Sequence, residues 1–346
     1  MEIRLALIGF GVVGQGLAEI LIDEEDLLRR LYGVELRVVA ISDTQKGSVY
    51  DPAGIDLVRL LDLVASTQRI DDYPGGTKGW DSVKTIKESN ANVIVEVSWT
   101  DIDTGEPAIT QVRTAIEHGK HVVTTNKGPI ALAGEELLEL AKKNGVELRF
   151  EGTVLSGTPA ISLGTWNLAA AGTTAVRGIV NGTTNYILTE MEQGLDYDAA
   201  LKQAQELGYA EADPTADVEG YDATAKILIL ANLIMGGHLT KDQVESQGIT
   251  KITKEDVMSA KAEGKRWKLI AAARLNDDGS VMASVRPEKL PLDDPLASVM
   301  GPTNAITYET KYLGSVTIVG PGAGKLETGY SLLHDILDIH RGASRI

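Results

Sequence analysis

A glycine-rich turn close to the N-terminus restricts the fold more than any other feature of the sequence. Residues 3–8 are apolar and typical of a buried strand, and a helical pattern of apolar residues begins after position 14. A G-x-G-x-x-G turn between a strand and a helix is the fingerprint of a dinucleotide-binding unit, because N–H groups at the helix start can bind a pyrophosphate. The alternative, a glycine turn without a ligand, is disfavoured by this context. The turn residues, all candidates for coenzyme binding, are Gly9, Phe10, Gly11, Val12, Val13 and Gly14.

The second predicted strand, residues 35–42, is followed by an acid that bears on the choice of coenzyme. An acid at this end of the strand normally accepts hydrogen bonds from the adenosine ribose and repels a 2′-phosphate. Asp43 therefore favours NAD slightly over NADP. Lys46 follows closely and could bind a phosphate instead, so both coenzymes stay open.

Strands and helices alternate through the first 150 residues, which predicts an α/β, Rossmann-type doubly wound parallel sheet. Such sheets bind ligands at the carboxyl ends of their strands. Ser98 follows one predicted strand, and we expect it to contact the coenzyme. Lys127 follows another, where a lysine could simply be a surface charge. Further strands are predicted at 92–97, 121–124 and 146–150, helices at 106–118 and 131–144, and one or two amphipathic helices within 52–91.

After residue 159 the pattern changes, and we predict an α+β catalytic and dimerisation domain with an open mixed sheet. The last four strands are expected to form this sheet, with the helix 219–236 on one face and a dimer surface on the other. A second glycine loop, residues 320–324, precedes a final helix, which indicates that the chain returns to the first domain. The predicted domains are therefore 1–150 with the return helix 321–346, and 151–320. The predicted helices are 160–170 and 197–207, and the predicted strands are 175–180, 267–275, 280–287, 303–309 and 312–318.

Residues 204–226 combine many acids with a single lysine, which an apolar run follows at once. Asp222 and Lys226 are four residues apart and face the same side of a helix, while Glu211 and Asp217 lie in the preceding loop. A solvated ion pair is an equally weighted alternative. Because Lys226 adjoins the apolar run 227–235, we expect it to be partly desolvated and to transfer a proton to a substrate that carries an ammonium group.

Small polar residues follow the predicted strand 175–180 and begin a helix. Gly182 and Thr183 lie at this junction, where helix N–H groups and hydroxyls can hold a carboxylate. An ordinary helix cap is the alternative.

Composition excludes several classes of function. The net charge of −16 disfavours nucleic acid and anionic membranes as partners. The chain has no cysteine, so disulfides, thiolate metal sites and thiol nucleophiles are excluded. No apolar stretch reaches the roughly 20 residues needed to cross a bilayer, and no signal peptide is evident, so we expect a cytoplasmic protein. The five histidines lack metal-ligand spacing, and no catalytic metal is predicted.

Two segments, 178–188 and 204–226, resemble the homoserine dehydrogenase family. The second contains the order A-x3-G-Y-x-E-x-D-P-x2-D-x-x-G-x-D-x3-K, and the likeness extends from the first glycine loop to the last. The resemblance implies NAD(P)-dependent interconversion of L-homoserine and L-aspartate 4-semialdehyde, a step from aspartate toward threonine, methionine and isoleucine. It also implies a homodimer or a dimer of dimers. The chain ends shortly after the return helix, so no appended ACT domain and no feedback inhibition through one are expected.

The resemblance also implies roles for individual residues. Lys226 is the leading proton donor, with Lys127 able to share that role, and Asp222 orients the lysine or the substrate. Glu211 and Asp217 take the substrate ammonium or hydroxyl, while Thr183 and nearby N–H groups hold the substrate. Lys127 matches the Asn-Lys motif at the boundary between coenzyme and substrate and would contact the coenzyme, and Gly322 lies near the nicotinamide. A structural sodium site is implied at Glu151, Val154, Ser156 and Thr158.

Two other functions compete with this interpretation. One is a nicotinamide-dependent reductase of another amino-acid semialdehyde on the same two-domain plan. The other is a non-enzymatic dinucleotide sensor, which we would expect to carry a basic recognition helix or a partner-binding tail, and this acidic chain has neither.

Overall fold

The computed structural model describes residues 1–342 and divides into two compact units. Unit 1 contains Met1–Gly157 together with the segment that begins at Gly324, and unit 2 contains Thr158–Ala323. The boundaries expected from the sequence, 150/151 and 320/321, lie a few residues before these positions. None of the described helices is both long and apolar enough to span a bilayer.

Unit 1 is built on a seven-stranded sheet with the order β4-β3-β2-β1-β5-β6-β7. Five neighbouring strands pair in parallel, in the order β2, β1, β5, β6 and β7, which confirms the doubly wound sheet. The prediction missed the antiparallel edge formed by β3 and β4, because these strands are short and lack a long alternating pattern. The strands are β1 (Glu2–Ile8), β2 (Glu35–Asp43), β3 (Gly47–Tyr50), β4 (Thr77–Lys78), β5 (Val93–Glu96), β6 (His121–Thr124) and β7 (Leu148–Arg149).

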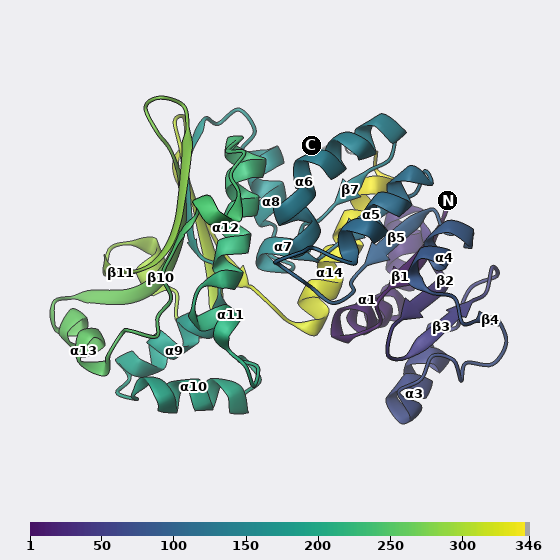
Figure 1. Ribbon diagram of the computed structural model, residues 1–346, viewed down its shortest axis with the longest axis horizontal. Coiled ribbons are helices and arrows are strands. Elements are labelled where there is room, and N and C mark those ends of the chain that lie inside the picture. The colour runs from purple at the N-terminus through teal and green to yellow at the C-terminus, as the bar shows by residue number, and fades with distance from the viewer. Residues whose placement is uncertain (343–346) are drawn as a thin grey trace. The chain divides into compact units, whose positions relative to one another are not determined.

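The segment that begins at Gly324 belongs to unit 1, and its helix, the last in the chain, packs beside the first helix of that unit (Figure 1). The two helices approach closely because Gly16 and Gly329 lack side chains: a Cβ atom at Gly16 would lie 2.2 Å from the carbonyl oxygen of Lys325. Leu332 and Ile336 complete the apolar core around β1. The helices of unit 1 are α1 (Val12–Asp23), α2 (Glu25–Leu27), η1 (Leu28–Tyr32), α3 (Leu57–Thr67), α4 (Ser82–Glu88), α5 (Ala108–Glu117), α6 (Lys127–Asn144), α7 (Gly152–Leu155) and α14 (Lys325–His340).

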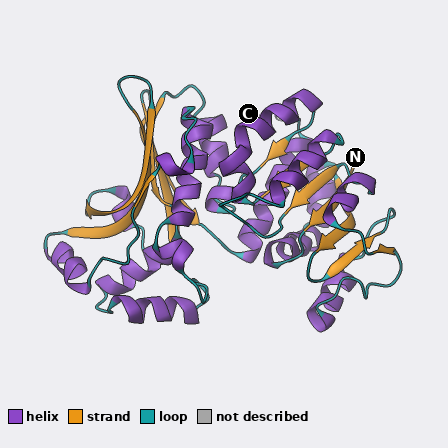
Figure 2. Ribbon diagram, viewed as in Figure 1, coloured by secondary structure: helices purple, strands orange, loops and turns teal. Residues whose placement is uncertain are grey.

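Unit 2 contains a six-stranded mixed sheet with the order β13-β12-β8-β10-β11-β9. The prediction of a sheet made from the last four strands alone is wrong, because β8 lies in the middle and pairs antiparallel with both β10 and β12. Helix α12 covers one face of the sheet, as predicted (Figure 2). The strands are β8 (Thr173–Ile179), β9 (Glu245–Ser246), β10 (Lys265–Leu275), β11 (Val281–Pro291), β12 (Thr303–Thr310) and β13 (Gly314–Pro321).

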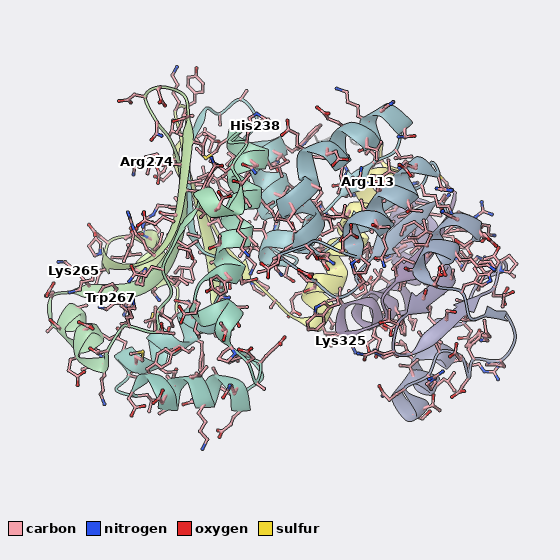
Figure 3. The ribbon with its side chains drawn as sticks, in the orientation of Figure 1. Arg113, His238, Lys265, Trp267, Arg274 and Lys325 are labelled. Carbon is pink, nitrogen blue, oxygen red and sulfur yellow. The ribbon has the colours of Figure 1, made fainter. Side chains whose placement is uncertain are left out.

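The helices of unit 2 start and end close to the predicted positions, with two differences. The predicted helix 160–170 is a short α-helix followed by a π-turn that ends at Asn167. The helix expected near Glu219 begins at Tyr221, because Gly220 has a left-handed conformation with φ of 84°. Trp267, labelled in Figure 3, joins β10 to α13 by donating a hydrogen bond to Asp256 O at 3.1 Å. These helices are α8 (Ala160–Ser162), η2 (Leu163–Asn167), α9 (Gly182–Glu192), α10 (Tyr197–Glu206), α11 (Thr215–Val218), α12 (Tyr221–Met235), η3 (Lys241–Gln243), α13 (Lys254–Ala262) and η4 (Pro295–Ser298).

Candidate active site

The glycine turn between β1 and α1 leaves room for a ligand at one glycine and none at the other two. A Cβ atom at Gly9 would lie 2.4 Å from the carbonyl oxygen of Val97, and one at Gly14 would lie 2.9 Å from Gly9 O. A Cβ at Gly11 would meet no described atom within 4 Å. Gly11 also precedes α1 without a capping side chain, so N–H groups at the helix start can receive a pyrophosphate. This geometry fits a dinucleotide.

Asp43, at the end of β2, fixes the glycine turn. Its Oδ2 accepts the N–H of Phe10 at 2.8 Å, and its Oδ1 accepts the N–H groups of Gln45 and Lys46, each at 2.9 Å. Burial alone would raise the pKa of this carboxyl, but the three backbone hydrogen bonds outweigh burial and leave the pKa below its usual value. Asp43 is therefore ionised, and its carboxylate is already hydrogen-bonded to the protein backbone without a ribose.

A buried glutamate at the end of β5 organises the neighbouring strand ends. Glu96 is fully buried and accepts hydrogen bonds from the Ser98 N–H at 2.9 Å, the Ser98 hydroxyl at 2.5 Å and the Thr124 hydroxyl at 2.8 Å. Asn126 also hydrogen-bonds to this carboxyl, whose pKa is raised by burial. Sequence reasoning missed Glu96, although an acid inside the apolar run Val93–Val97 was a usable signal.

The Glu96 network leads directly to Lys127. Asn126 caps α6, because its Oδ1 accepts the N–H of Gly128 at 3.2 Å, and Lys127 is the first residue of that helix. The predicted coenzyme residues Ser98 and Lys127 are thus both positioned by groups that contact one carboxylate.

In unit 2, Lys226 and Asp222 form a buried ion pair on α12. Lys226 Nζ lies 2.7 Å from Asp222 Oδ2 and donates a second hydrogen bond to Val180 O at 2.7 Å. The two side chains are only 10% and 15% exposed. This burial rules out the alternative of a solvated surface pair.

Asn181 connects this pair to a second acid. Its Nδ2 donates to Asp217 Oδ1 at 2.6 Å and to Asp222 Oδ2 at 3.0 Å. Burial raises the pKa of Asp217, and the nearby charge of Asp222 raises it further. Two carboxyls facing one ammonium leave the cluster with an excess of acidic groups, which suits a substrate that brings its own ammonium group.

The start of α9 adjoins the acid–lysine cluster. Asn181 Oδ1 accepts the N–H of Thr184 at 2.9 Å, which makes Asn181 the cap of α9. The Thr183 hydroxyl donates to Tyr209 O at 2.6 Å and also interacts with Asp217. The structure therefore brings Gly182 and Thr183 next to the predicted acids. Sequence reasoning did not single out Asn181, although its place between a strand and a Gly-Thr helix start was the signal.

Two predicted site residues lie apart from these contacts. Glu211 is exposed, and its backbone carbonyl accepts a hydrogen bond from Gln205 Nε2 at 3.1 Å. Gly322 lies against the side chain of Asn304 instead, with a hypothetical Cβ 2.3 Å from Asn304 Cγ.

The residues implied for sodium lie along the chain on both sides of the boundary between unit 1 and unit 2. In unit 1, the N–H of the buried Glu151 donates to Asp335 Oδ2 at 2.9 Å, and the Ser156 hydroxyl is 2.8 Å from that of Thr328. Val154 is buried in α7. In unit 2, the Thr158 hydroxyl donates to Pro321 O at 2.9 Å.

Burial raises the pKa of Asp335 well above its usual value, and the charge of Glu151 adds to this effect. The two acids are close enough to interact, and a nearby cation would stabilise both in their charged forms.

Two family models match the chain. The model described as homoserine dehydrogenase, NAD binding domain, matches residues 9–151, and the model described as homoserine dehydrogenase matches residues 159–337. Together they include every predicted site residue except three of the residues implied for sodium, Val154, Ser156 and Thr158, which lie between the two matches.

Named relatives align with nearly the entire chain. An NAD(+)-dependent homoserine dehydrogenase of Pseudomonas canavaninivorans is 46% identical over 99% of this chain and 98% of its own length. A homoserine dehydrogenase of Methanocaldococcus jannaschii is 43% identical, with 99% of each chain covered. A solved hyperthermophilic archaeal homoserine dehydrogenase in complex with NADPH superposes with a TM-score of 0.86 at 31% identity, and covers 100% of this chain and 99% of its own.

Proposed function

The chain belongs to the homoserine dehydrogenase family, and we propose that Lys226 is the proton donor in its reaction. The protein is an NAD(P)-dependent oxidoreductase that interconverts L-homoserine and L-aspartate 4-semialdehyde. The matches favour this function over a reductase of another semialdehyde and over a dinucleotide sensor. The observation that supports the residue assignment is the buried Lys226–Asp222 pair, which Asn181 joins to Asp217.

Lys226 has the donors that reduction of an aldehyde requires. When bound, NAD(P)H supplies the hydride that adds to the aldehyde carbon, and the oxygen then needs a proton. The ammonium group has three N–H bonds, and Asp222 and Val180 O accept two of them. The third can point at the substrate oxygen, while Asp222 holds the lysine in place. Lys127, at the start of α6, is the second candidate for this role.

The substrate ammonium binds to the acids in this proposal. Asp217 and Asp222 provide two carboxyls, and the exposed Glu211 would join them by turning inward from the loop before α11. Thr183 and the N–H groups at the start of α9 hold the opposite end of the amino acid. The positive ammonium of the substrate thereby meets carboxyls, and its negative carboxylate meets N–H and hydroxyl donors.

The coenzyme binds to the glycine turn of residues 9–14 in this proposal. Ser98 would contact it, Lys127 would lie at the boundary between coenzyme and substrate, and Gly322 would lie near the nicotinamide. NAD is slightly favoured because the ionised Asp43 repels a 2′-phosphate. The named relatives include one NAD(+)-dependent enzyme and one complex with NADPH, so the preference rests on Asp43.

We also propose a cytoplasmic homodimer or dimer of dimers that uses the sheet face opposite α12. Met282 is 54% exposed and alternates along β11 with the buried Val281 and Ala283, so it lies on that opposite face. A sodium ion held by Glu151 and carbonyls of Val154, Ser156 and Thr158 would also offset the buried charge near Asp335.

A spectrophotometric assay tests the function and the coenzyme preference together. Reduction of NAD and of NADP is followed separately at 340 nm with L-homoserine as the substrate. We expect turnover with both coenzymes and a higher kcat/KM with NAD. An enzyme that is silent toward homoserine but oxidises another amino alcohol would point to the rival reductase.

A further inference from the structure

A buried carboxamide in β12 has no role in the contacts described above. The side chain of Asn304 is 1% exposed, and neither its Nδ2 nor its Oδ1 has a hydrogen-bond partner within the part of the chain that the structure describes. Buried amides nearly always have partners, because their lost hydration is otherwise uncompensated. A bound molecule could therefore supply the hydrogen-bond partner that the amide of Asn304 lacks.

The amide of Asn304 lies between two glycines that the sequence had indicated as site residues. A Cβ atom at Gly322 would lie 2.3 Å from Asn304 Cγ, and one at Gly182 would lie 3.3 Å from its Oδ1. No side chain fits at Gly322 while the amide keeps its position. Gly182 is the first residue of α9, so the amide is adjacent to the N-terminus of an 11-residue helix.

A second buried network fixes this position. Asn185, in α9, donates from Nδ2 to Gly301 O at 2.9 Å and to Thr303 O at 3.0 Å. The buried Lys268 donates in turn to Asn185 Oδ1 at 2.8 Å. The segment that leads into Asn304 is therefore tied to α9, and the distance between the amide and the helix start is set by several hydrogen bonds.

The groups around Asn304 are donors for a small anion. The N–H groups of Gly182 and Thr183 have no carbonyl partner inside α9, and a helix N-terminus carries partial positive charge. Because neither amide atom of Asn304 is engaged, the amide can present Nδ2 to the same point. The nearby carboxyls of Asp217 and Asp222 would repel an anion, so its binding place must be on the side of Asn181 that faces the start of α9, away from the two acids.

We propose that Asn304 binds the α-carboxylate of the amino-acid substrate, together with the N–H groups of Gly182 and Thr183. This inference rests on the proposed function and adds a binding residue to it. Gly322 covers the amide, so the carboxylate reaches Asn304 when the turn 320–324 moves aside, and three glycines give that turn the necessary freedom. The substrate carboxylate then replaces the contact with Gly322.

The variant Asn304→Leu tests this role, because leucine has a similar shape and no polar atoms. We expect the KM for L-homoserine to rise about 10-fold or more, as for the loss of a hydrogen bond to a charged group. Inhibition by 3-amino-1-propanol, which is homoserine without its carboxylate, should keep its Ki. The thermal midpoint should not fall, because both unpartnered atoms are removed. Thr307→Val, at a buried hydroxyl in the same strand that pairs with Thr317, is the matched control and should leave KM unchanged.

An unchanged KM in the leucine variant would overturn the proposal, and so would a parallel rise of KM and Ki, because a structural defect affects both ligands alike. If the leucine variant does not fold, Asn304→Ala removes the amide without added bulk and is measured in the same way. Failure of the proposed function is recognised separately, because the wild-type protein would then not oxidise homoserine at all.

Discussion

Replacing Lys226 with methionine removes the buried ammonium and keeps most of the side-chain volume. Asp222 loses the ammonium that neutralises it while only 15% of its side chain is exposed, and breaking a buried ion pair costs about 3–5 kcal/mol of unfolding free energy. Loss of a general acid lowers kcat by about 10²- to 10⁴-fold. The affinity for NAD should not change, because the glycine turn and Asp43 belong to unit 1.

Initial rates at 340 nm and urea unfolding separate the catalytic effect from the stability effect. In Lys226→Met/Asp222→Asn both charges of the pair are gone, so most of the lost stability should return. Activity should not return, because no proton donor replaces the lysine. A wild-type kcat in the single variant, or recovery of activity in the double variant, would refute the assignment of Lys226.

Three further predictions concern groups with distinct electrostatic roles. Asp43→Ala should weaken NAD binding more than NADP binding in fluorescence titrations; equal losses would mean that Asp43 acts only through the turn that it holds at Phe10. Glu96→Gln turns one of the two acceptor oxygens of this carboxyl into an NH2 donor, so the thermal midpoint should fall and the Kd for NAD should rise, whereas an unchanged Kd would contradict the role assigned to this network. Burial lowers the pKa of Lys268 to about 8 from 10.5, so the unfolded state binds more protons between these pH values, and stability should rise with pH there by at most about 1.4 kcal/mol per unit. Lys268→Met should lack this rise in urea unfolding, and parallel pH curves for both proteins would contradict it.

The features that the sequence predicted correctly depend on residues close together in the chain. The glycine turn is a strand, a six-residue motif and a helix in succession, and each part is visible in the local pattern. The Lys226–Asp222 pair follows from helical spacing, and its burial follows from the apolar run after Lys226. Such local signals need no knowledge of which strands pair.

The features that were missed depend on contacts between distant segments. β8 occupies the middle of its sheet, although its partners β10 and β12 lie far along the chain. Glu96 gains its role only because β5 and β6 are neighbours, so that Thr124 can reach it. Asn304 looks like an ordinary strand residue until its amide is found between Gly182 and Gly322. Pairing of distant segments is set by tertiary packing, which a single sequence does not display.

Asparagine is required at position 181, which lies between the proposed binding sites for the ammonium and the carboxylate of the substrate. Its Oδ1 caps α9 through the Thr184 N–H, while its Nδ2 donates to both Asp217 and Asp222. Serine or threonine can cap a helix but lacks the NH2 group that serves two carboxyls. Aspartate can cap as well, but it would add a third carboxyl beside Asp217, whose pKa is already raised by burial and by the charge of Asp222. Only an amide can accept on the helix side and donate on the acid side, and it thereby fixes the start of α9, the proposed carboxylate site, relative to Asp222 and Asp217.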